Sequence, residues 1–203
     1  MNSSKPVIYV VDDDASILTA LTRLLRAGGY AVHSFTSADG FLENQSADSP
    51  GCIIADLHMP GMNGMELQDA LAKTGSPLPV IFLTGHGDIP TSVHAMRKGA
   101  EDFLTKPVKR EKLFDAVERA LARNMRDREA HAKSRELRAL YETLTPRERE
   151  VLRHVVTGQL NKQIAADINA AERTVKAHRA NLMAKLRVQS VAELTRLAQA
   201  LGI

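Results

Sequence analysis

The sequence predicts an α/β domain with a doubly wound, five-stranded parallel sheet, followed by an all-α domain. In the first 121 of the 203 residues, short apolar segments alternate with segments of helical periodicity. The apolar segments are nearly continuous, which is typical of parallel strands covered by helices on both faces. After residue 121 no strand pattern returns. We therefore expect an α/β domain at 1–121, a helical linker at 122–143 and a helical domain at 144–203.

The first domain contains five β/α units in succession. Its predicted strands are VIYVV (7–11), AVHSF (31–35), CIIAD (52–56), VIFLT (80–84) and DFLTK (102–106). Asp14 can cap the first helix, whose apolar residues recur from Ile17 until Gly28 and Gly29 end it. Further helices are predicted at 38–45, 65–73, 90–98 and after Pro107. This succession favours the doubly wound arrangement.

The second half is helical, and several of its helix ends can be read from the sequence. Residues 122–140 are rich in Arg, Glu and Ala and contain neither Gly nor Pro, so they extend the last helix as an exposed linker or a stalk for dimerisation. A coiled coil stays open, because apolar positions there are sparse. Thr145 with Glu148, and Ser190 with Glu193, have the spacing of capping boxes. Helices are predicted at 146–157, 161–168, 172–186 and after Ser190.

Charge is distributed unevenly along the chain. The formal net charge of +3 combines −4 in residues 1–121 with +7 in residues 122–203. A basic second module suggests nucleic acid as its partner. Because the longest apolar runs are too short to span a bilayer and no secretory signal is visible, we expect no membrane association and a cytoplasmic protein. Its single cysteine, Cys52, is expected to be a small core residue.

The segment VIYVVDDDAS (7–16) places three adjacent carboxylates directly after an apolar strand. By themselves these acids could form a solvated turn. In a doubly wound sheet, however, ligands bind beyond the carboxyl ends of the strands. Asp12 and Asp13 end the first predicted strand, and Asp56, Thr84 and Lys106 end the third, fourth and fifth. Together these side chains make an oxygen-rich site that suits Mg²⁺, a hard cation.

Four ordered segments resemble the marker segments of the receiver domain of two-component response regulators: VVDDDAS (10–16), DLHMPGMNG (56–64), LTGHGD (83–88) and DFLTKP (102–107). The resemblance covers residues 7 to about 121. It implies that Asp56 accepts a phosphoryl group from a phosphohistidine of a sensor histidine kinase, with Mg²⁺ as the cofactor. The implied Mg²⁺ ligands are Asp13, Asp56 and the main-chain carbonyl of His58, with Asp12 acting largely through water.

The same resemblance assigns roles to three further residues. Lys106 supplies a positive charge to the phosphoryl oxygens, and Thr84 donates a hydrogen bond to them. Phe103 is the aromatic switch residue that turns inward when the threonine moves, although core packing alone would also explain a phenylalanine there. The Lys106–Pro107 bond is expected to be cis, because cis is accessible mainly before proline. Ligation of the metal by the His58 side chain is a further alternative.

A second resemblance covers residues 144–195. The segments LTPREREVL, NKQIAADI and RTVKAHRANLMAKL resemble the four-helix, LuxR-type helix-turn-helix domain found in regulators such as FixJ and NarL. This implies binding to double-stranded promoter DNA, with the third helix in the major groove. Base edges would be contacted by Lys176, Ala177 and Ala180. Phosphates would be contacted by Lys162, Arg173, Thr174 and Arg179.

The turn before the third helix departs from this family's pattern. It reads INAAERTVK (168–176), where the family often has Leu-Gly-Ile-Ser. Asn169 tolerates the left-handed conformation that glycine would supply. Ala171 replaces a hydroxyl-bearing N-cap, which should cost about 1 kcal/mol of helix stability. The spacing of Val175, Leu182 and Leu186 predicts the buried stripe of this helix.

Together the motifs imply a phosphorylation-dependent, DNA-binding transcription regulator. We expect no enzymatic activity beyond the protein's own phosphotransfer and dephosphorylation. Phosphorylation would bias a two-state first domain, and so either change dimerisation or release the second domain. A homodimer of the phosphorylated protein would bring two recognition helices to adjacent half-sites, with RNA polymerase as a further partner.

Two other functions are considered. The D-x-D of Asp12 and Asp14 also occurs in phosphatases of the haloacid dehalogenase type, but Ser16 stands where these enzymes have Thr or Val, and a later paired-acid motif is missing. Alternatively, a regulator could bind DNA whatever its phosphorylation state and use the first domain only as a dimerisation scaffold. The intact acceptor, hydroxyl and lysine of the first domain argue against this.

Overall fold

The computed structural model describes residues 6–44, 50–85 and 89–203. The chain divides into two compact units between Arg128 and Glu129. Within the described ranges, no helix combines the length and the apolar character that a membrane span requires. The end of the predicted LTGHGD segment, residues 86–88, lies outside the described residues.

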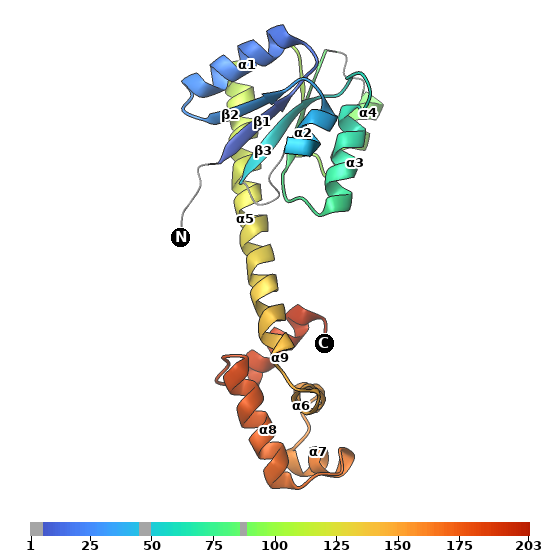
Figure 1. Ribbon diagram of the computed structural model, residues 1–203, viewed down its shortest axis with the longest axis vertical. Coiled ribbons are helices and arrows are strands. Elements are labelled where there is room, and N and C mark those ends of the chain that lie inside the picture. Colours follow the sequence, from blue (N-terminus) through green and yellow to red (C-terminus); the bar gives the residue numbers. More distant parts are fainter. Residues whose placement is uncertain (1–5, 45–49, 86–88) are drawn as a thin grey trace. The chain divides into compact units, whose positions relative to one another are not determined.

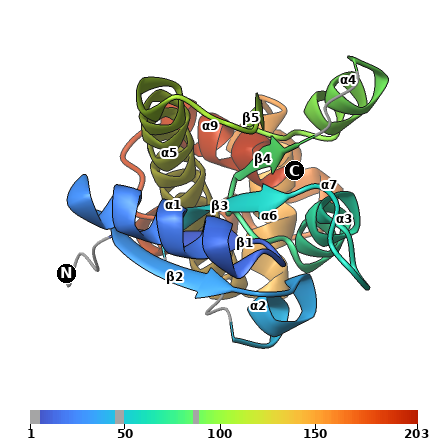
Figure 2. The same cartoon turned by 90° about the horizontal axis from the view of Figure 1, so that it is seen from above.

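The first unit is a five-stranded parallel sheet with helices on both faces (Figures 1 and 2). Its strands are β1 (Val7–Val11), β2 (Ala31–Phe35), β3 (Gly51–Asp56), β4 (Val80–Thr84) and β5 (Asp102–Thr105). They lie in the order β2-β1-β3-β4-β5, and every neighbouring pair is parallel. The chain thus moves from β1 to one side and then to the other, which confirms the predicted doubly wound sheet.

Helices cover both faces because successive side chains of a strand point to opposite sides of the sheet. The helices of this unit are α1 (Ala15–Ala27), α2 (Ala38–Asn44), α3 (Gly64–Thr74), α4 (Ile89–Arg97) and α5 (Arg110–Glu142). Ile8 and Val10 of β1 belong to the core that α1 and α5 cover. Tyr9 and Val11 belong to the core that α2, α3 and α4 cover. Cys52 is buried in the first of these cores, as expected.

The predicted linker is part of one continuous helix, α5. Asn124, which lies beyond the predicted end of the first domain, is 1% exposed. Its Oδ1 accepts a hydrogen bond from the N–H of Gly51 (3.0 Å), and its Nδ2 donates to the carbonyl of Pro77 (2.6 Å). Leu137 and Leu140, further along α5, pack against the core of the second unit. The linker is helical, and the domain boundaries stay predictions.

Four helices follow α5 in the second unit: α6 (Pro146–Val156), α7 (Asn161–Asp167), α8 (Glu172–Lys185) and α9 (Val191–Leu201). Their shared core contains Val175, Leu182 and Leu186, which confirms the predicted buried stripe of α8. Thr145 forms the expected capping box at the start of α6: its hydroxyl accepts from the N–H of Glu148, whose carboxylate accepts from the N–H of Thr145.

The prediction of a capping box at the start of α9 is correct for one of its two hydrogen bonds and wrong for the other. The Ser190 hydroxyl accepts from the N–H of Glu193 (3.2 Å), as expected. The Glu193 carboxylate, however, accepts from the N–H of Gln189 (2.8 Å). Both N-cap residues have an extended backbone, but φ is −138° at Ser190 and −66° at Thr145.

Candidate functional site

The polar residues predicted at the strand ends lie at one edge of the sheet. Asp12 directly follows β1, Asp56 is the last residue of β3, Thr84 is the last residue of β4, and Lys106 directly follows β5. These four strands are consecutive neighbours and parallel, so their carboxyl ends lie side by side. Asp13 completes the group, since one carboxylate oxygen from each of Asp12, Asp13 and Asp56 lies within 4.8 Å of the others.

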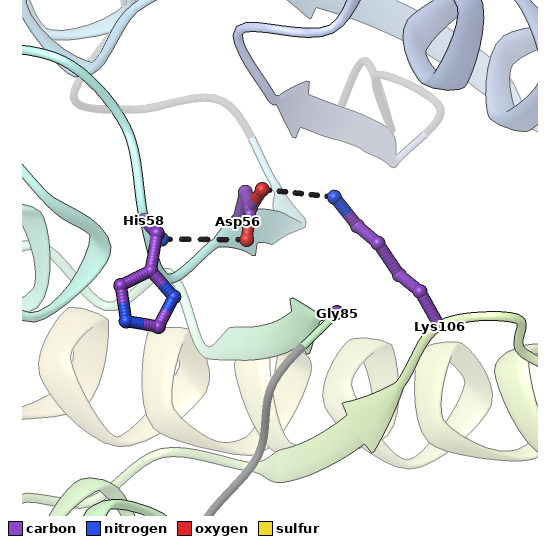
Figure 3. A pocket seen from close by; sticks show the side chains of 4 residues that line it. All are labelled: Asp56, His58, Gly85 and Lys106. Carbon is purple, nitrogen blue, oxygen red and sulfur yellow. Dashed lines mark hydrogen bonds and ion pairs between the residues drawn. The ribbon is translucent and has the colours of Figure 1, made fainter.

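Lys106 connects two of these carboxylates. Its Nζ lies 2.6 Å from Oδ2 of Asp12 and 2.8 Å from Oδ2 of Asp56. The other oxygen of Asp56 accepts a hydrogen bond from the N–H of His58 (3.4 Å), so Asp56 lies between Lys106 and the backbone of His58 (Figure 3). The pocket beside Asp56 has a volume of about 440 Å³ and is lined by Asp56, His58, Gly85 and Lys106. Asp56 is therefore accessible to a small group that enters this pocket.

Burial and pairing shift the pKa values of Asp12 and Lys106. Asp12 is 1% exposed, and this burial raises its pKa, although hydrogen bonds from Lys106 and from the N–H of Asp14 partly oppose the shift. Burial by itself would lower the pKa of Lys106, but its hydrogen bonds to Asp12 and Asp56 outweigh burial and raise it. The raised pKa favours the charged form of Lys106, and its one ammonium is paired with two carboxylates.

The residues present fit a divalent metal ion. Asp12, Asp13 and Asp56 offer only oxygen ligands, the type that Mg²⁺ binds. Their combined negative charge exceeds what Lys106 neutralises, so a cation would relieve the repulsion among them. Within the described part of the chain, this cluster of side chains does not include the imidazole of His58. The role of the His58 main-chain carbonyl as a ligand stays a prediction.

Thr84 and Phe103, the two residues with predicted switch roles, lie on the neighbouring strands β4 and β5. Thr84 is fully buried, and its carbonyl accepts from the N–H of Lys106 (2.7 Å), which joins the ends of β4 and β5. The ring of Phe103 is half-buried and lies against that of Phe82, with their centroids 6.2 Å apart. Phe103 therefore makes core contacts in this conformation, and its role as a switch stays a prediction. The Lys106–Pro107 bond is cis, as expected.

Asp14 does not belong to the metal cluster. Its carboxylate accepts hydrogen bonds from the N–H of Ser16 (2.8 Å) and the N–H of Ile17 (3.4 Å), and also from the Ser16 hydroxyl (2.6 Å). These bonds from Ser16 lower the pKa of Asp14. This confirms that Asp14 is the N-cap of α1.

The predicted DNA-contacting residues gather on α7 and the outer face of α8. Arg173, Lys176, Ala177 and Ala180 are exposed on α8, and Lys162 is exposed on α7. Two others are half-buried: Thr174 and Arg179. Because the apolar stripe of α8 points into the core, the exposed residues of α8 lie on the face turned away from that core. Their individual contacts with DNA stay predictions.

Two side-chain contacts on this surface were missed by sequence reasoning. Nη1 of Arg179 donates to Oδ1 of Asn161 (3.0 Å), which joins α8 to the first residue of α7. Nζ of Lys176 lies 3.1 Å from Oε1 of Glu172 within α8. The i, i+4 spacing of Glu172 and Lys176 could have indicated the second contact. The first joins residues 18 positions apart and has no local signal.

The turn between α7 and α8 agrees with the sequence. Asn169 adopts a left-handed backbone (φ 49°), as expected for the residue that replaces glycine. Ala171 is the N-cap of α8 and supplies no side-chain hydrogen bond. Arg187, after the end of α8, also has a positive φ (55°), which was not predicted. The family's turn therefore forms without its usual glycine and hydroxyl.

Comparisons with known proteins cover both units. Residues 8–118 match the response regulator receiver domain, and residues 142–198 match the bacterial regulatory proteins of the luxR family. Nodulation protein W of Bradyrhizobium diazoefficiens is 44% identical over 201 residues, which cover 99% of this chain and 88% of that protein. The response regulator protein TmoT of Ectopseudomonas mendocina is also 44% identical, over 99% of this chain and 91% of its own length.

Two solved structures are similar to this chain over nearly its whole length. The response regulator StyR has a TM-score of 0.85 and 44% identity, covering 97% of this chain and 99% of its own. Full-length FixJ from B. japonicum has a TM-score of 0.59 and 38% identity, covering 98% of each chain. These matches are to transcription regulators and lend no support to the phosphatase alternative. The chain belongs to the two-component response regulators that join a receiver domain to a LuxR-type DNA-binding domain, as FixJ does.

Proposed function

We propose that a sensor histidine kinase phosphorylates this regulator on Asp56 in a Mg²⁺-dependent reaction, and that phosphorylation promotes its binding to promoter DNA. The observation that carries the proposal is the position of Asp56. Its Oδ2 lies 2.8 Å from the ammonium of Lys106, in the wall of an open pocket, and Asp12 and Asp13 lie close by.

Transfer to Asp56 forms a bond between a carboxylate oxygen and phosphorus, and it breaks the bond between phosphorus and the kinase histidine nitrogen. A carboxylate is a weak nucleophile, so the reaction depends on in-line positioning and on neutralisation of charge. Lys106 supplies positive charge next to the acceptor oxygen. Mg²⁺ held by Asp12, Asp13 and Asp56 would neutralise the oxygens of the transferred group.

Thr84, at the end of the strand next to Asp56, and Phe103, on the following strand, transmit the change. Once the phosphoryl group is in place, the hydroxyl of Thr84 donates a hydrogen bond to it. To make this hydrogen bond, the side chain of Thr84 moves toward the phosphoryl group. The space that Thr84 leaves allows the ring of Phe103 to turn inward from its place against Phe82. The receiver then favours a second conformation, in which the protein dimerises.

The second domain reads DNA with α8 in the major groove. A homodimer brings two copies of α8 to adjacent half-sites, where Lys176, Ala177 and Ala180 face base edges. The phosphate contacts come from four residues: Lys162, Arg173, Thr174 and Arg179. RNA polymerase is a further partner of the DNA-bound dimer. We place the protein in the cytoplasm, where it meets both promoter DNA and the phosphohistidine of its kinase.

The experiment that tests this function compares the wild type with Asp56→Asn. The full chain is incubated with Mg²⁺ and radiolabelled acetyl phosphate, and its binding to a pool of random duplexes is measured before and after. The wild type should be labelled and then bind DNA more tightly, whereas Asp56→Asn should show neither change. Asp115→Asn, at an exposed position of α5, is the matched control and should behave as the wild type.

Two outcomes would contradict the proposal in different ways. Full labelling of Asp56→Asn would move the acceptor to another residue. Binding of unlabelled Asp56→Asn as tight as that of the phosphorylated wild type would favour the alternative in which the receiver is only a dimerisation scaffold.

A further inference from the structure

The outer face of α8 carries an ion pair in the middle of the surface assigned to DNA. Nζ of Lys176 lies 3.1 Å from Oε1 of Glu172, and the two side chains are 62% and 46% exposed. Glu172 is the first residue of α8 and its one acidic residue. Ala180 is exposed one turn beyond Lys176, so Glu172, Lys176 and Ala180 follow one another at four-residue intervals on one stripe.

The cations of this surface differ in the charge of their partners. Arg179 donates to the neutral amide of Asn161, so its guanidinium keeps a full positive charge that can attract any phosphate. Lys176 is paired with a carboxylate, and the pair together has no net charge. Loose, sequence-independent binding depends on cations that replace the counterions of the phosphates. The Lys176–Glu172 pair therefore adds little to such binding.

A base pair can satisfy both members of the ion pair at once. In a helix-turn-helix, the residues near the N-terminus of the second helix contact base edges in the major groove. A lysine ammonium donates to N7 and O6 of guanine, and a glutamate accepts from the N4 amino group of cytosine. We propose that Glu172 and Lys176 act as one unit that reads a G·C pair, with Glu172 as a specificity-determining residue. This inference rests on the proposed DNA-binding function.

The ion pair between Glu172 and Lys176 would also form in the free protein if its role were only to stabilise α8. An acid in the first turn of a helix interacts favourably with the helix dipole, and an i, i+4 ion pair stabilises the helix itself. That role affects the stability of α8 but not the sequence it binds. The test must therefore measure sequence preference while the net charge of the protein stays constant.

The decisive variants are Glu172→Gln alone, which tests the glutamate, and Glu172→Gln with Lys176→Met, which leaves the net charge unchanged. The full chain, with Mg²⁺ and acetyl phosphate, selects duplexes from a random pool, and its affinity for random duplex is measured against salt. The wild type should select a site with an invariant G·C pair. In this double variant, and also in Glu172→Gln alone, discrimination between G·C and A·T at that one position should fall about tenfold. Binding to random duplex over the same salt series separates this loss of sequence preference from a general loss of affinity.

The matched control replaces both members of an ion pair outside α8 by uncharged residues. Nη1 of Arg147 lies 2.7 Å from Oε2 of Glu150 on α6, and Arg147→Met with Glu150→Gln is also neutral in net charge. This control should select the same site as the wild type. Selection of the wild-type site by Glu172→Gln alone or by the double variant overturns the inference and leaves the proposed function intact. A wild type that binds no duplex at any salt concentration overturns both.

Discussion

The ammonium of Lys106 lies 2.8 Å from the carboxylate of Asp56, although 50 positions separate the two residues in the sequence. The same ammonium lies 2.6 Å from the buried carboxylate of Asp12. Lys106 therefore has two effects: it compensates the charge of a buried acid, and it places positive charge beside the proposed phosphoryl acceptor.

Substitution of Lys106 by methionine should lower the initial rate of labelling of Asp56 by acetyl phosphate on the order of 100-fold. This is the usual loss when one preorganised group that stabilises developing charge is removed. The matched control is Lys98→Met, because Lys98 forms a surface ion pair with Asp69 (2.7 Å). An undiminished rate in Lys106→Met, measured at equal Mg²⁺, would contradict the role assigned to the lysine.

Mg²⁺ should raise the thermal stability of the wild type in the absence of any phosphoryl donor. A ligand that binds only the folded chain adds about 2.7 kcal/mol at 100 times its dissociation constant. Asp13→Asn removes one of the three carboxylates of the cluster, so its melting temperature should respond less to Mg²⁺. Thermal unfolding of both proteins in a Mg²⁺ titration, with a chelator as reference, measures this difference. Equal responses would exclude Asp13 as a ligand.

The ion pair of Glu148 with Lys185 (2.7 Å) should make the second unit sensitive to acid. Burial by itself would raise the pKa of Glu148, but its hydrogen bonds with Lys185 and Thr145 outweigh burial and lower it below 4.5. A carboxyl whose pKa is lower in the folded state stabilises that state above its unfolded pKa. This contribution is lost as the pH falls below about 4.5 and through the folded pKa.

Lys185→Met should remove much of this acid sensitivity and should destabilise the unit by about 2 kcal/mol at neutral pH, because Glu148 is left buried without its cation. Hydrogen exchange of the amides in α6 and α8 as a function of pH measures both effects. Lys162→Met, at an exposed position of α7, serves as the control. An identical pH profile for Lys185→Met and the wild type would show that the pair contributes nothing.

Ala171→Ser should stabilise α8 by about 1 kcal/mol. Ala171 already has the extended backbone of an N-cap (φ −71°, ψ 142°) but no side-chain acceptor for the first amides of the helix, and a serine hydroxyl would supply one. Slower hydrogen exchange in the first turn of α8 is the expected result. Ala184→Ser, at an exposed position inside the same helix, should not slow exchange there. No change in Ala171→Ser would indicate that water already satisfies these amides.

Local sequence signals were sufficient to predict the helices and strands of both units. The five strands and the helices between them were predicted to within one or two residues, because apolar periodicity and glycine or proline punctuation act over short distances. The same holds for the caps at Asp14 and Thr145 and for the left-handed turn at Asn169. The group around Asp56 was also predictable, since parallel strands must bring their carboxyl ends to one edge.

Partners far apart in the sequence were decided only by the tertiary structure. Asn124 joins α5 to Gly51 and Pro77, and Asn161 holds Arg179 from another helix. Even within a local cap the partner differed from the expected one, since the Glu193 carboxylate accepts from the N–H of Gln189. The periodicity of apolar residues specifies which face of a helix or strand is buried. The hydrogen-bond partner of a polar side chain, in contrast, must lie within about 3 Å of it in the folded structure. Which atoms come this close depends on how all the helices and strands pack together.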